Sequence, residues 1–350
     1  MCVRDTVARV FPPHTPVGRI GEKALLRYIR SRVSHGRGVS IGIGDDAAAV
    51  ETGPLTLMTT DSLVEGVHFR REWAPDTLLG RKALSVNLSD IDAMGGVPRY
   101  ATVSLCLPAD TPFAFVEGFY DGLLSRTAQT GVEIVGGNLS GTSGAIVVDI
   151  TVLGHGQPLL RRSGALPGDV AMVTGRLGAA AMGVRLLGEG SRLATISEDD
   201  QAARRCLVAQ LDPTPPLGFG NAVAREELAH AAIDLSDGLS GDLLAVCQES
   251  GVSAWVDGDT MPIDPGAAML ARDRGIDARD LALHGGEDYQ LLLAASVEAV
   301  PRLRDLAAGM EIALTVVGGF AEGEPALSLL TAQGAVPLVP RSHEHFGGGG

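Results

Sequence analysis

Acidic side chains recur in five short groups along the sequence, and their types and spacing indicate metal chemistry. The groups are Asp45–Asp46, Asp61, Asp90–Asp92, Asp234–Asp237 and Glu287–Asp288. In the first group, two adjacent carboxylates follow a Gly-x-Gly turn. At about 4 Å and an effective dielectric constant near 20, two such charges repel each other by about 4 kcal/mol. Either both side chains point into water, or a cation lies between them and other carboxylates.

Each group taken alone also has an ordinary structural interpretation. Asp45 and Asp46 fit a solvated turn, and Asp61, between Thr60 and Ser62, fits a helix cap. Asp90 is harder to explain in this way, because it falls on the apolar stripe of an expected helix. A buried carboxylate needs a partner or a metal ion, so we expect a functional role for Asp90.

The segments around Asp234 and Glu287 combine carboxylates with backbone amides. The segment "DLSDG" (234–238) follows an apolar strand and begins a helix, and capping explains at most one of its two aspartates. The segment "GGED" (285–288) places N–H groups beside carboxylates, which suits a phosphate with its metal ion, although an ordinary turn fits as well. His68 ends an apolar segment, where a histidine is more often structural than a ligand.

Carboxylates with hydroxyls, and no zinc-type set of histidine and cysteine, suit a hard cation, Mg²⁺ above all. Together with glycine-rich loops, this set predicts a site for nucleotide phosphates. The common nucleotide-binding motifs are missing, since neither G-x-x-x-x-G-K-[ST] nor the kinase motifs H-R-D and D-F-G occur. The segment "TGRLGAAA" (174–181) lacks the full dinucleotide fingerprint, and its glycines are interpreted as close packing.

The composition is typical of an acidic globular protein of about two domains. The chain has 350 residues, of which 45% are hydrophobic, yet no stretch approaches the roughly 18 apolar residues of a membrane span. A net charge of −14 and an aromatic content of 4% argue against nucleic acid as a partner. The four isolated cysteines fit a reducing compartment. Without a signal-peptide pattern, we expect a cytoplasmic protein that binds no membrane.

Helical and strand patterns alternate along the chain and predict mixed α/β domains. We expect helices at 21–34, 78–94, 113–131, 179–187 and 239–249, and strands at 55–60, 99–107, 133–135, 145–153, 170–174 and 314–317. The turn-rich segment 156–169 marks a domain boundary. The sequence is thus divided into an N-terminal extension (1–18), an N-terminal domain (19–156), a C-terminal domain (157–346) and a flexible tail (347–350). The acidic groups are expected where strands end or helices begin, where sites are usually built.

The order of the motifs resembles that of the thiamine-monophosphate kinase family, in the superfamily of aminoimidazole ribonucleotide synthetase and selenophosphate synthetase. The motifs are "GIGDDAAAV", "TTDSLVEGVHF", "KALSVNLSDIDAMGGVP", "RRSGALPGD", "IDLSDGLSGDL" and "GGEDYQLLL", and the resemblance runs from Gly18 to Phe346. It implies a two-domain, synthetase-like α/β (α+β) fold. An N-terminal mixed-sheet domain would bind ATP and metal and form a dimer barrel, and a C-terminal α/β domain would follow.

The resemblance also implies an activity and a set of residues. Members transfer the γ-phosphoryl group of ATP to thiamine monophosphate, with several Mg²⁺ ions, as homodimers. The implied metal positions are Asp46, Thr59, Thr60, Asp61, Asp90, Asn138, Asp234 and Asp237. Four of these are implied to be catalytic, namely Asp46, Asp61, Asp90 and Asp237, and Asp45 would support them. ATP contacts are implied at Gly137, Asn138, Arg162 and Ser236, and substrate contacts at His68, Glu287 and His343.

Two positions depart from the family pattern. Asn138 stands where the family has aspartate after Gly136 and Gly137, so one metal position loses its charge. His343 stands where an aromatic residue is expected against the thiamine ring. These departures keep two alternatives open: a superfamily relative that acts on another acceptor, and a nucleotide-binding protein that has lost catalysis.

Overall fold

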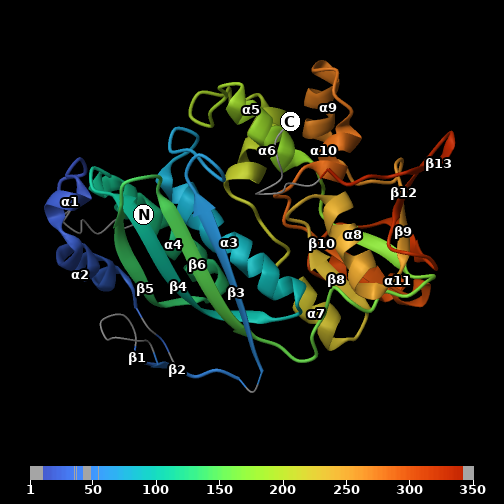
Figure 1. The fold of residues 1–350 in the computed structure, drawn as a ribbon, viewed down its shortest axis with the longest axis horizontal. Coiled ribbons are helices and arrows are strands. Elements are labelled where there is room, and N and C mark those ends of the chain that lie inside the picture. Colours follow the sequence, from blue (N-terminus) through green and yellow to red (C-terminus); the bar gives the residue numbers. More distant parts are fainter. Residues whose placement is uncertain (1–10, 35, 37, 42–48, 54, 342–350) are drawn as a thin grey trace. The chain divides into compact units, whose positions relative to one another are not determined.

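The computed structural model describes residues 11–34, 36, 38–41, 49–53 and 55–341 (Figure 1). Backbone contacts divide the chain into two compact units. The N-terminal unit consists of Met1–Thr52, Thr60–Leu84 and Arg99–Leu153, and the C-terminal unit of Gly53–Thr59, Ser85–Pro98 and Gly154–Gly350. Among the described residues, three strands (56–64, 97–108 and 147–155) and one helix (76–93) therefore begin in one unit and end in the other. The domain boundary at 156/157 stays a prediction.

A four-stranded sheet of order β3-β6-β4-β5 forms the centre of the N-terminal unit. The elements of this part of the chain are α1 (Val17–Ile20), α2 (Glu22–Arg32), β1 (Val39–Ile41), β2 (Ala49–Val50), β3 (Thr56–Val64), α3 (Asp76–Ala93), β4 (Val97–Pro108), α4 (Phe113–Thr130), β5 (Glu133–Thr142) and β6 (Val147–His155). Strands β4 and β5 run parallel, and β1 and β2 form a separate antiparallel pair.

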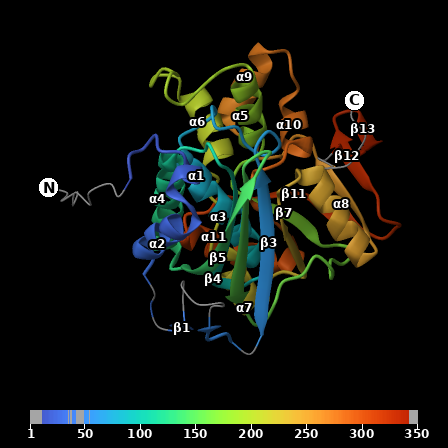
Figure 2. The same cartoon turned by 60° about the vertical axis from the view of Figure 1, so that its left-hand side comes forward.

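Helix α4 lies along one face of this sheet (Figures 1 and 2). On β4, the alternate residues Val103, Leu105 and Leu107 are buried, as expected for a strand with one face in the core. The side chains between them, including Ser104 and Cys106, point to the opposite face and are half-buried. The sheet thus presents one apolar and one more polar face.

A seven-stranded sheet of order β13-β12-β9-β11-β7-β10-β8 organises the C-terminal unit. It is mixed, because β12 runs parallel to β9 while its other pairings are antiparallel. Its strands are β7 (Val170–Thr174), β8 (Ala231–Asp234), β9 (Ser253–Asp257), β10 (Leu291–Ala295), β11 (Leu314–Ala321), β12 (Leu327–Thr331) and β13 (Gly334–Pro337). Its helices are α5 (Ala179–Gly188), α6 (Gln201–Leu211), α7 (Phe219–Arg225), α8 (Leu239–Ser250), α9 (Pro265–Asp273), α10 (Ala278–His284), η1 (Val297–Ala299) and α11 (Val300–Gly309).

Both faces of the seven-stranded sheet are covered. Leu292 of β10 packs in a cluster with Leu243 of α8. Its neighbour Leu293 points the other way and packs in a second cluster with Phe219 of α7 and Leu303 of α11. A strand that is buried on both faces has a continuous run of apolar residues in its sequence, and β10 has such a run. The centre of this sheet is therefore a rigid base for the loops that follow its strands.

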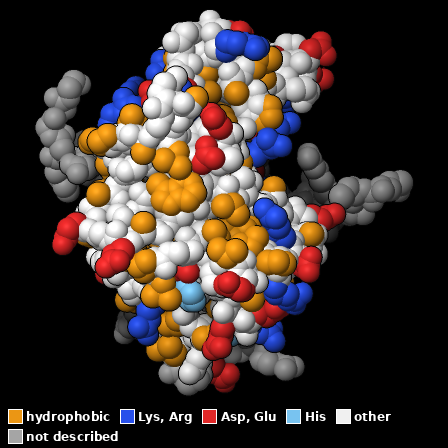
Figure 3. Space-filling view, turned by 90° about the vertical axis from the view of Figure 1, so that its right-hand side faces the viewer, with side chains coloured by type: hydrophobic (Ala, Val, Ile, Leu, Met, Phe, Trp, Pro, Cys, Tyr) orange, Lys and Arg blue, Asp and Glu red, His pale blue; other side chains and the backbone are white. Residues whose placement is uncertain are grey.

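Figure 3 shows the side of the molecule that carries the far strands of this sheet, where apolar side chains gather between scattered charges. Among the exposed apolar residues of these strands are Trp255 of β9 and Val336 of β13. Within the described residues, no helix is both long and apolar enough to cross a membrane.

Strands β3 and β5 continue beyond the ranges expected from the sequence, which changes the local setting of two candidate residues. Strand β3 continues to Val64, so that Asp61 lies within a strand and not at its end. Strand β5 continues to Thr142, so that Asn138 also lies within a strand. The glycine pair before Asn138 indicates a turn, but a Cβ on Gly137 would lie 2.0 Å from the carbonyl oxygen of Val103. Glycine is there because the neighbouring strand approaches closely.

Candidate active site

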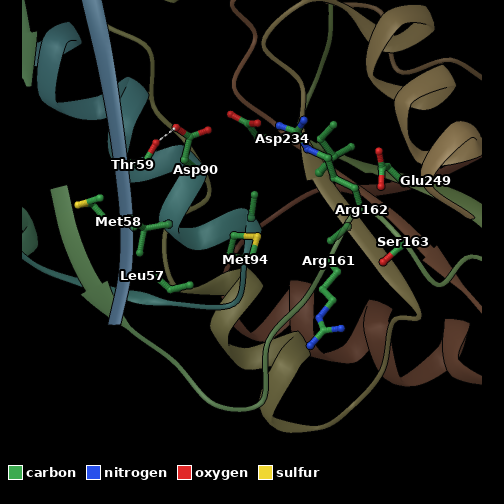
Figure 4. A pocket seen from close by; sticks show the side chains of 14 residues that line it. Leu57, Met58, Thr59, Asp90, Met94, Arg161, Arg162, Ser163, Asp234 and Glu249 are labelled. Carbon is green, nitrogen blue, oxygen red and sulfur yellow. Dashed lines mark hydrogen bonds between the residues drawn. The ribbon is translucent and has the colours of Figure 1, made fainter. Parts of the chain in front are cut away.

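A cavity of about 480 Å³ lies within the C-terminal unit (Figure 4). Its wall is built by the start of β3, the end of α3, the loop before β7, strand β8 and the last turn of α8. The lining residues are Leu57, Met58, Thr59, Asp90, Ile91, Ala93, Met94, Arg161, Arg162, Ser163, Ala232, Ile233, Asp234 and Glu249. The cavity thus combines an apolar floor with carboxylates and two arginines. Four residues singled out from the sequence are in this set: Thr59, Asp90, Arg162 and Asp234.

The end of α3 holds two of these carboxylates in place. The hydroxyl of Thr59 donates to Oδ2 of Asp90 at 2.6 Å. The hydroxyl of Ser89 donates to Oδ2 of Asp234 at 2.7 Å. Because Ser89 and Asp90 are adjacent, one turn of helix positions both carboxylates, and Figure 4 shows them on the same side of the cavity. The helix expected to carry Asp90 is present as α3. Asp90 was expected to be buried but is half-buried, and its functional role stays a prediction.

A third carboxylate, Asp242, lies close to Asp234 and Asp237, and sequence reasoning missed it. The pKa of Asp242 is raised to about 8, mainly by burial and also by the negative charges of Asp234 and Asp237, against the charge of Arg162. Its carboxylate also accepts the N–H of Asp237 at 3.2 Å. Three carboxyl groups therefore meet at the turn from β8 into α8, where a bound cation would favour their ionised forms.

Oxygen ligands of this kind fit Mg²⁺. Among the described residues, no three Asp, Glu, His or Cys side chains are arranged to hold a metal ion by themselves. Mg²⁺ does not require such a cage, because it keeps several waters and is usually bound by one or two carboxylates plus substrate phosphates. Thr59, Asp90 and Asp234 offer a hydroxyl and two carboxylates at one cavity. The donor set is therefore compatible with this cation.

The segment "GGEDY" (285–289) packs against the turn that carries Ser236. The N–H of Glu287 donates to the carbonyl of Ser236 at 2.8 Å, and the N–H of Tyr289 donates to that of Leu235 at 2.8 Å. A Cβ on Gly286 would lie 2.4 Å from the Ser236 carbonyl oxygen. The structure thus brings Ser236 and Glu287 together, as expected for residues of one site.

Two side chains anchor this segment: Gln210, which was not identified from the sequence, and Asp288, which belongs to the acidic group expected at 287–288. Gln210 of α6 donates from Nε2 to the carboxylate of Glu287. Asp288 is half-buried, and its carboxylate accepts the N–H of Gly178 at 2.8 Å at the start of α5. Burial raises the pKa of Asp288 to about 7 despite the hydrogen bonds from Gly178 and Ala180. The function of Asp288 in the fold is therefore to tie two segments together.

The N-terminal unit contains the remaining described candidates. Thr60 donates to Oδ1 of Asp149 at 3.2 Å, on the opposite side of β3 from Asp61, because side chains alternate along a strand. Asn138 is exposed and donates from Nδ2 to Ser140 at 3.0 Å. Nδ1 of His68 accepts the N–H of Val64 at 3.0 Å, which is a turn-forming contact.

Asp149 was missed because it lies far from Thr60 in sequence, on a strand that shows no motif. The candidates Asp45, Asp46 and His343 lie outside the described residues.

Known proteins are similar to this chain over most of its length. The family model "AIR synthase related protein, N-terminal domain" matches residues 44–155. The chain is 34% identical to the thiamine-monophosphate kinase of Aquifex aeolicus over 87% of this chain and 93% of that protein. It is 38% identical to that of Mycobacterium tuberculosis over 81% of this chain and 83% of the relative.

Solved structures give the same result. The thiamine-monophosphate kinase of Stenotrophomonas maltophilia K279a is similar with a TM-score of 0.78 and 36% identity, covering 87% of this chain and 95% of that one. AaThiL complexed with AMPPCP and TMP is similar with a TM-score of 0.75 and 32% identity, covering 95% and 99%. The hydrogenase maturation protein HypE shares only the fold, with a TM-score of 0.74 at 17% identity. The synthetase-like α/β fold expected from the sequence is thereby confirmed.

Proposed function

The chain belongs to the thiamine-monophosphate kinase family, and we propose that it transfers the γ-phosphoryl group of ATP to thiamine monophosphate. The products would be thiamine diphosphate and ADP. The observation that carries this proposal is the similarity to AaThiL, which was solved with AMPPCP and TMP and matches 95% of this chain. The cavity described above adds the polar groups that such a reaction needs.

Phosphoryl transfer to a phosphate requires positioning more than proton transfer. The attacking oxygen is already ionised at neutral pH, so the reaction has no need of a strong general base. The rate depends on bringing two anions into line and on compensating their charge. Arg162 would supply a fixed positive charge for a phosphate group. Thr59, Asp90 and Asp234 would hold Mg²⁺, which when bound neutralises charge on the transferred group.

We extend this proposal to the other positions implied by the family motifs. Asp61 and Asp237 would be catalytic with Asp46 and Asp90, and Thr60 and Asn138 would complete the metal positions. Gly137, Asn138 and Ser236 would contact ATP with Arg162. His68, Glu287 and His343 would contact the thiamine substrate. Support for the last group is the hydrogen bond that orients the Glu287 carboxylate, which comes from a buried side chain.

We also propose that the protein acts as a homodimer, through the half-buried face of the four-stranded sheet. Ser104 and Cys106 on β4 lie on this face. A Ser104→Arg substitution would place a charge there and is expected to give monomers in light scattering. Ser328→Arg, on β12 of the other sheet, is the matched control and should leave the mass unchanged. Equal masses for both variants and the wild type would contradict the assignment of the interface.

Location in the cytoplasm stays a prediction.

The decisive experiment is an assay of ADP release with ATP and Mg²⁺. Three reactions are compared, with thiamine monophosphate, with thiamine and with no acceptor. Release only with the monophosphate is the expected result. It would also mean that Asn138 and His343 are tolerated variations of the family pattern. Binding of ATP without turnover on the monophosphate would favour another acceptor or a non-catalytic relative.

A further inference from the structure

The basic side of the cavity is carried by a loop without regular structure. Residues 161–165 lie between β6 and β7 and contain no helix or strand. Arg162 is exposed, and Figure 4 shows its side chain directed toward Asp234, whereas Arg161 is directed away. The position of this backbone therefore sets which part of the cavity the Arg162 side chain can reach. What holds this backbone decides whether the charge lies over the cavity.

One hydroxyl makes three hydrogen bonds with this loop. Ser250, the last residue of α8, accepts the N–H of Gly164 at 3.1 Å and that of Ala165 at 3.1 Å. The same hydroxyl donates to the carbonyl oxygen of Arg162 at 3.3 Å. A serine hydroxyl has one donor and two acceptor sites, so these three bonds use its full capacity. The backbone on both sides of Ser163 is thus tied to the end of one helix.

Two further contacts restrict the loop to one path. The N–H of Ala232 in β8 donates to the carbonyl of Arg161 at 2.8 Å. Gly164 has a φ of +121°, and a Cβ there would lie 2.5 Å from the carbonyl oxygen of His230. The loop therefore passes close to β8 and is held on its other side by Ser250. Without the hydroxyl, the contact with β8 would remain but the part after Arg162 would lose its anchor.

Helix α8 thereby connects the two charged sides of the cavity. Its first turn carries Asp242, next to Asp234 and Asp237. Its last turn carries Glu249, which lines the cavity, and Ser250, which holds the arginine loop. A helix of twelve residues is a rigid spacer. One helix therefore sets the separation between the acidic turn and the backbone of the arginine loop.

We propose that Ser250 is a positioning residue that holds Arg162 in place to bind a phosphate group of the nucleotide. The proposal rests on the proposed function, in which Arg162 contacts ATP. Ser250 itself touches no substrate. Its role would be to keep the guanidinium over the cavity before the nucleotide arrives, which lowers the ordering cost of binding.

The test compares nucleotide binding among matched variants. Ser250→Ala removes the hydroxyl, and Ser250→Thr keeps it. Ser253→Ala is the control, since Ser253 is a half-buried serine three residues later whose hydroxyl donates to the carbonyl of Ala321 at 3.1 Å, away from the loop. The affinity for AMPPCP with Mg²⁺ is measured by calorimetry, together with KM for ATP, kcat and Tm.

Ser250→Ala is expected to weaken AMPPCP binding by about 10-fold, the effect of losing roughly one strong hydrogen bond. The KM for ATP should rise by a similar factor while kcat changes less. Ser250→Thr should bind as the wild type does. Ser253→Ala is expected to lower Tm without changing affinity. If Ser250→Ala fails to fold, Ser250→Cys keeps the size of the side chain, weakens its hydrogen bonds and is compared in the same way.

An Arg162→Ala variant separates the two ways in which the proposal can fail. If Ser250 acts through Arg162, the double variant should bind AMPPCP no more weakly than Arg162→Ala alone. Additive losses, or a Ser250→Ala variant that loses only Tm, would overturn the role of Ser250 while leaving the proposed function intact. Wild-type affinity in Arg162→Ala would instead overturn the nucleotide contact of Arg162, and the role of Ser250 with it.

Discussion

Hydroxyl groups of neighbouring residues orient two of the acidic residues that line the cavity. Thr59 donates to Asp90, and Ser89 donates to Asp234. Each bond uses one of the roughly four acceptor positions of an ionised carboxyl group. The chemistry of these residues therefore depends on their charge more than on their shape. Replacing a carboxylate by the isosteric amide removes the charge and keeps the shape of the side chain.

Asp90→Asn should reduce kcat by about 100-fold or more, because a carboxylate that holds a catalytic cation contributes several kcal/mol. The amide oxygen can still accept from Thr59, so Tm should stay close to that of the wild type. Steady-state turnover with thiamine monophosphate is the measurement. Asp305→Asn, on the exposed side of α11, is the control and should be fully active. Near-normal turnover in Asp90→Asn would remove Asp90 from the metal site.

Asn138→Asp tests whether the unusual amide lies near a metal ion. Restoring the charge should lower the Mg²⁺ concentration that gives half-maximal activity, by about 3- to 10-fold, since charge count tunes the affinity of such sites. Gln333→Glu adds the same charge in an exposed hairpin and should have no effect. An unchanged Mg²⁺ dependence in Asn138→Asp would place residue 138 outside the metal site.

At the scale of elements, the contact between the segments 234–238 and 285–289 shapes the candidate site. Besides the hydrogen bonds from Glu287 and Tyr289, the N–H of Leu235 donates to the carbonyl of Gln290 at 2.7 Å. Glu287 has a φ of 67°, an unusual conformation for a residue other than glycine. Such strain persists only where the surroundings fix it. Here the surroundings are the facing turn and Gln210.

Gly286→Ala is expected to lower the free energy of unfolding by about 1–3 kcal/mol, because the added methyl group would clash with the Ser236 carbonyl. It should also lower kcat/KM, since Glu287 and Ser236 would move apart. Urea unfolding and the kinase assay measure the two effects. Gly309→Ala is the control, because a Cβ at Gly309 meets nothing within 4 Å and alanine favours the helix. Equal stability of the two variants would contradict the close contact.

Sequence patterns predicted the helices and strands with strong periodicity. They failed to predict strand ends and side-chain roles that depend on contacts with residues far away in the sequence. The helix that carries Asp90 was expected at 78–94 and is found at Asp76–Ala93. Strand β7 was expected at its observed bounds. In contrast, the end of β5 was placed too early, because the reason for Gly137 is a carbonyl on another strand. Gln210, Asp242, Ser250 and Asp149 were missed because their partners, or the reason for their burial, are visible only in three dimensions.

At the scale of the whole molecule, buried carboxylates couple folding to pH. Burial raises the pKa of Asp76 and of Asp92 to about 6, of Asp288 to about 7 and of Asp242 to about 8. Each of these folded-state values lies above the ordinary value of the carboxyl group. At a pH between the ordinary pKa of the carboxyl group and its raised pKa in the fold, the folded protein binds more protons than the unfolded chain. The stability of the protein therefore falls as pH rises through this range.

The free energy of unfolding should therefore decrease from about pH 5 to about pH 8. Asp288→Asn should flatten this decrease, because the amide does not ionise. The contribution of Asp288 is roughly 4 kcal/mol at most, since one pKa unit corresponds to about 1.4 kcal/mol. Urea unfolding at several pH values measures the slope, and the exposed Asp305→Asn should keep it. A wild-type slope in Asp288→Asn would contradict the raised pKa.

The close contact between "DLSDG" and "GGEDY" has a consequence for how this sequence can diverge. Gly286 faces the Ser236 carbonyl, and a Cβ on Gly238 would lie 2.8 Å from the carbonyl oxygen of Gly285. Each segment therefore sets the space that the other can occupy, so a substitution in one is expected to require a matching change in the other, although about fifty residues separate them. A chimera that takes one segment from a distant relative should lose activity, and one that takes both should regain it.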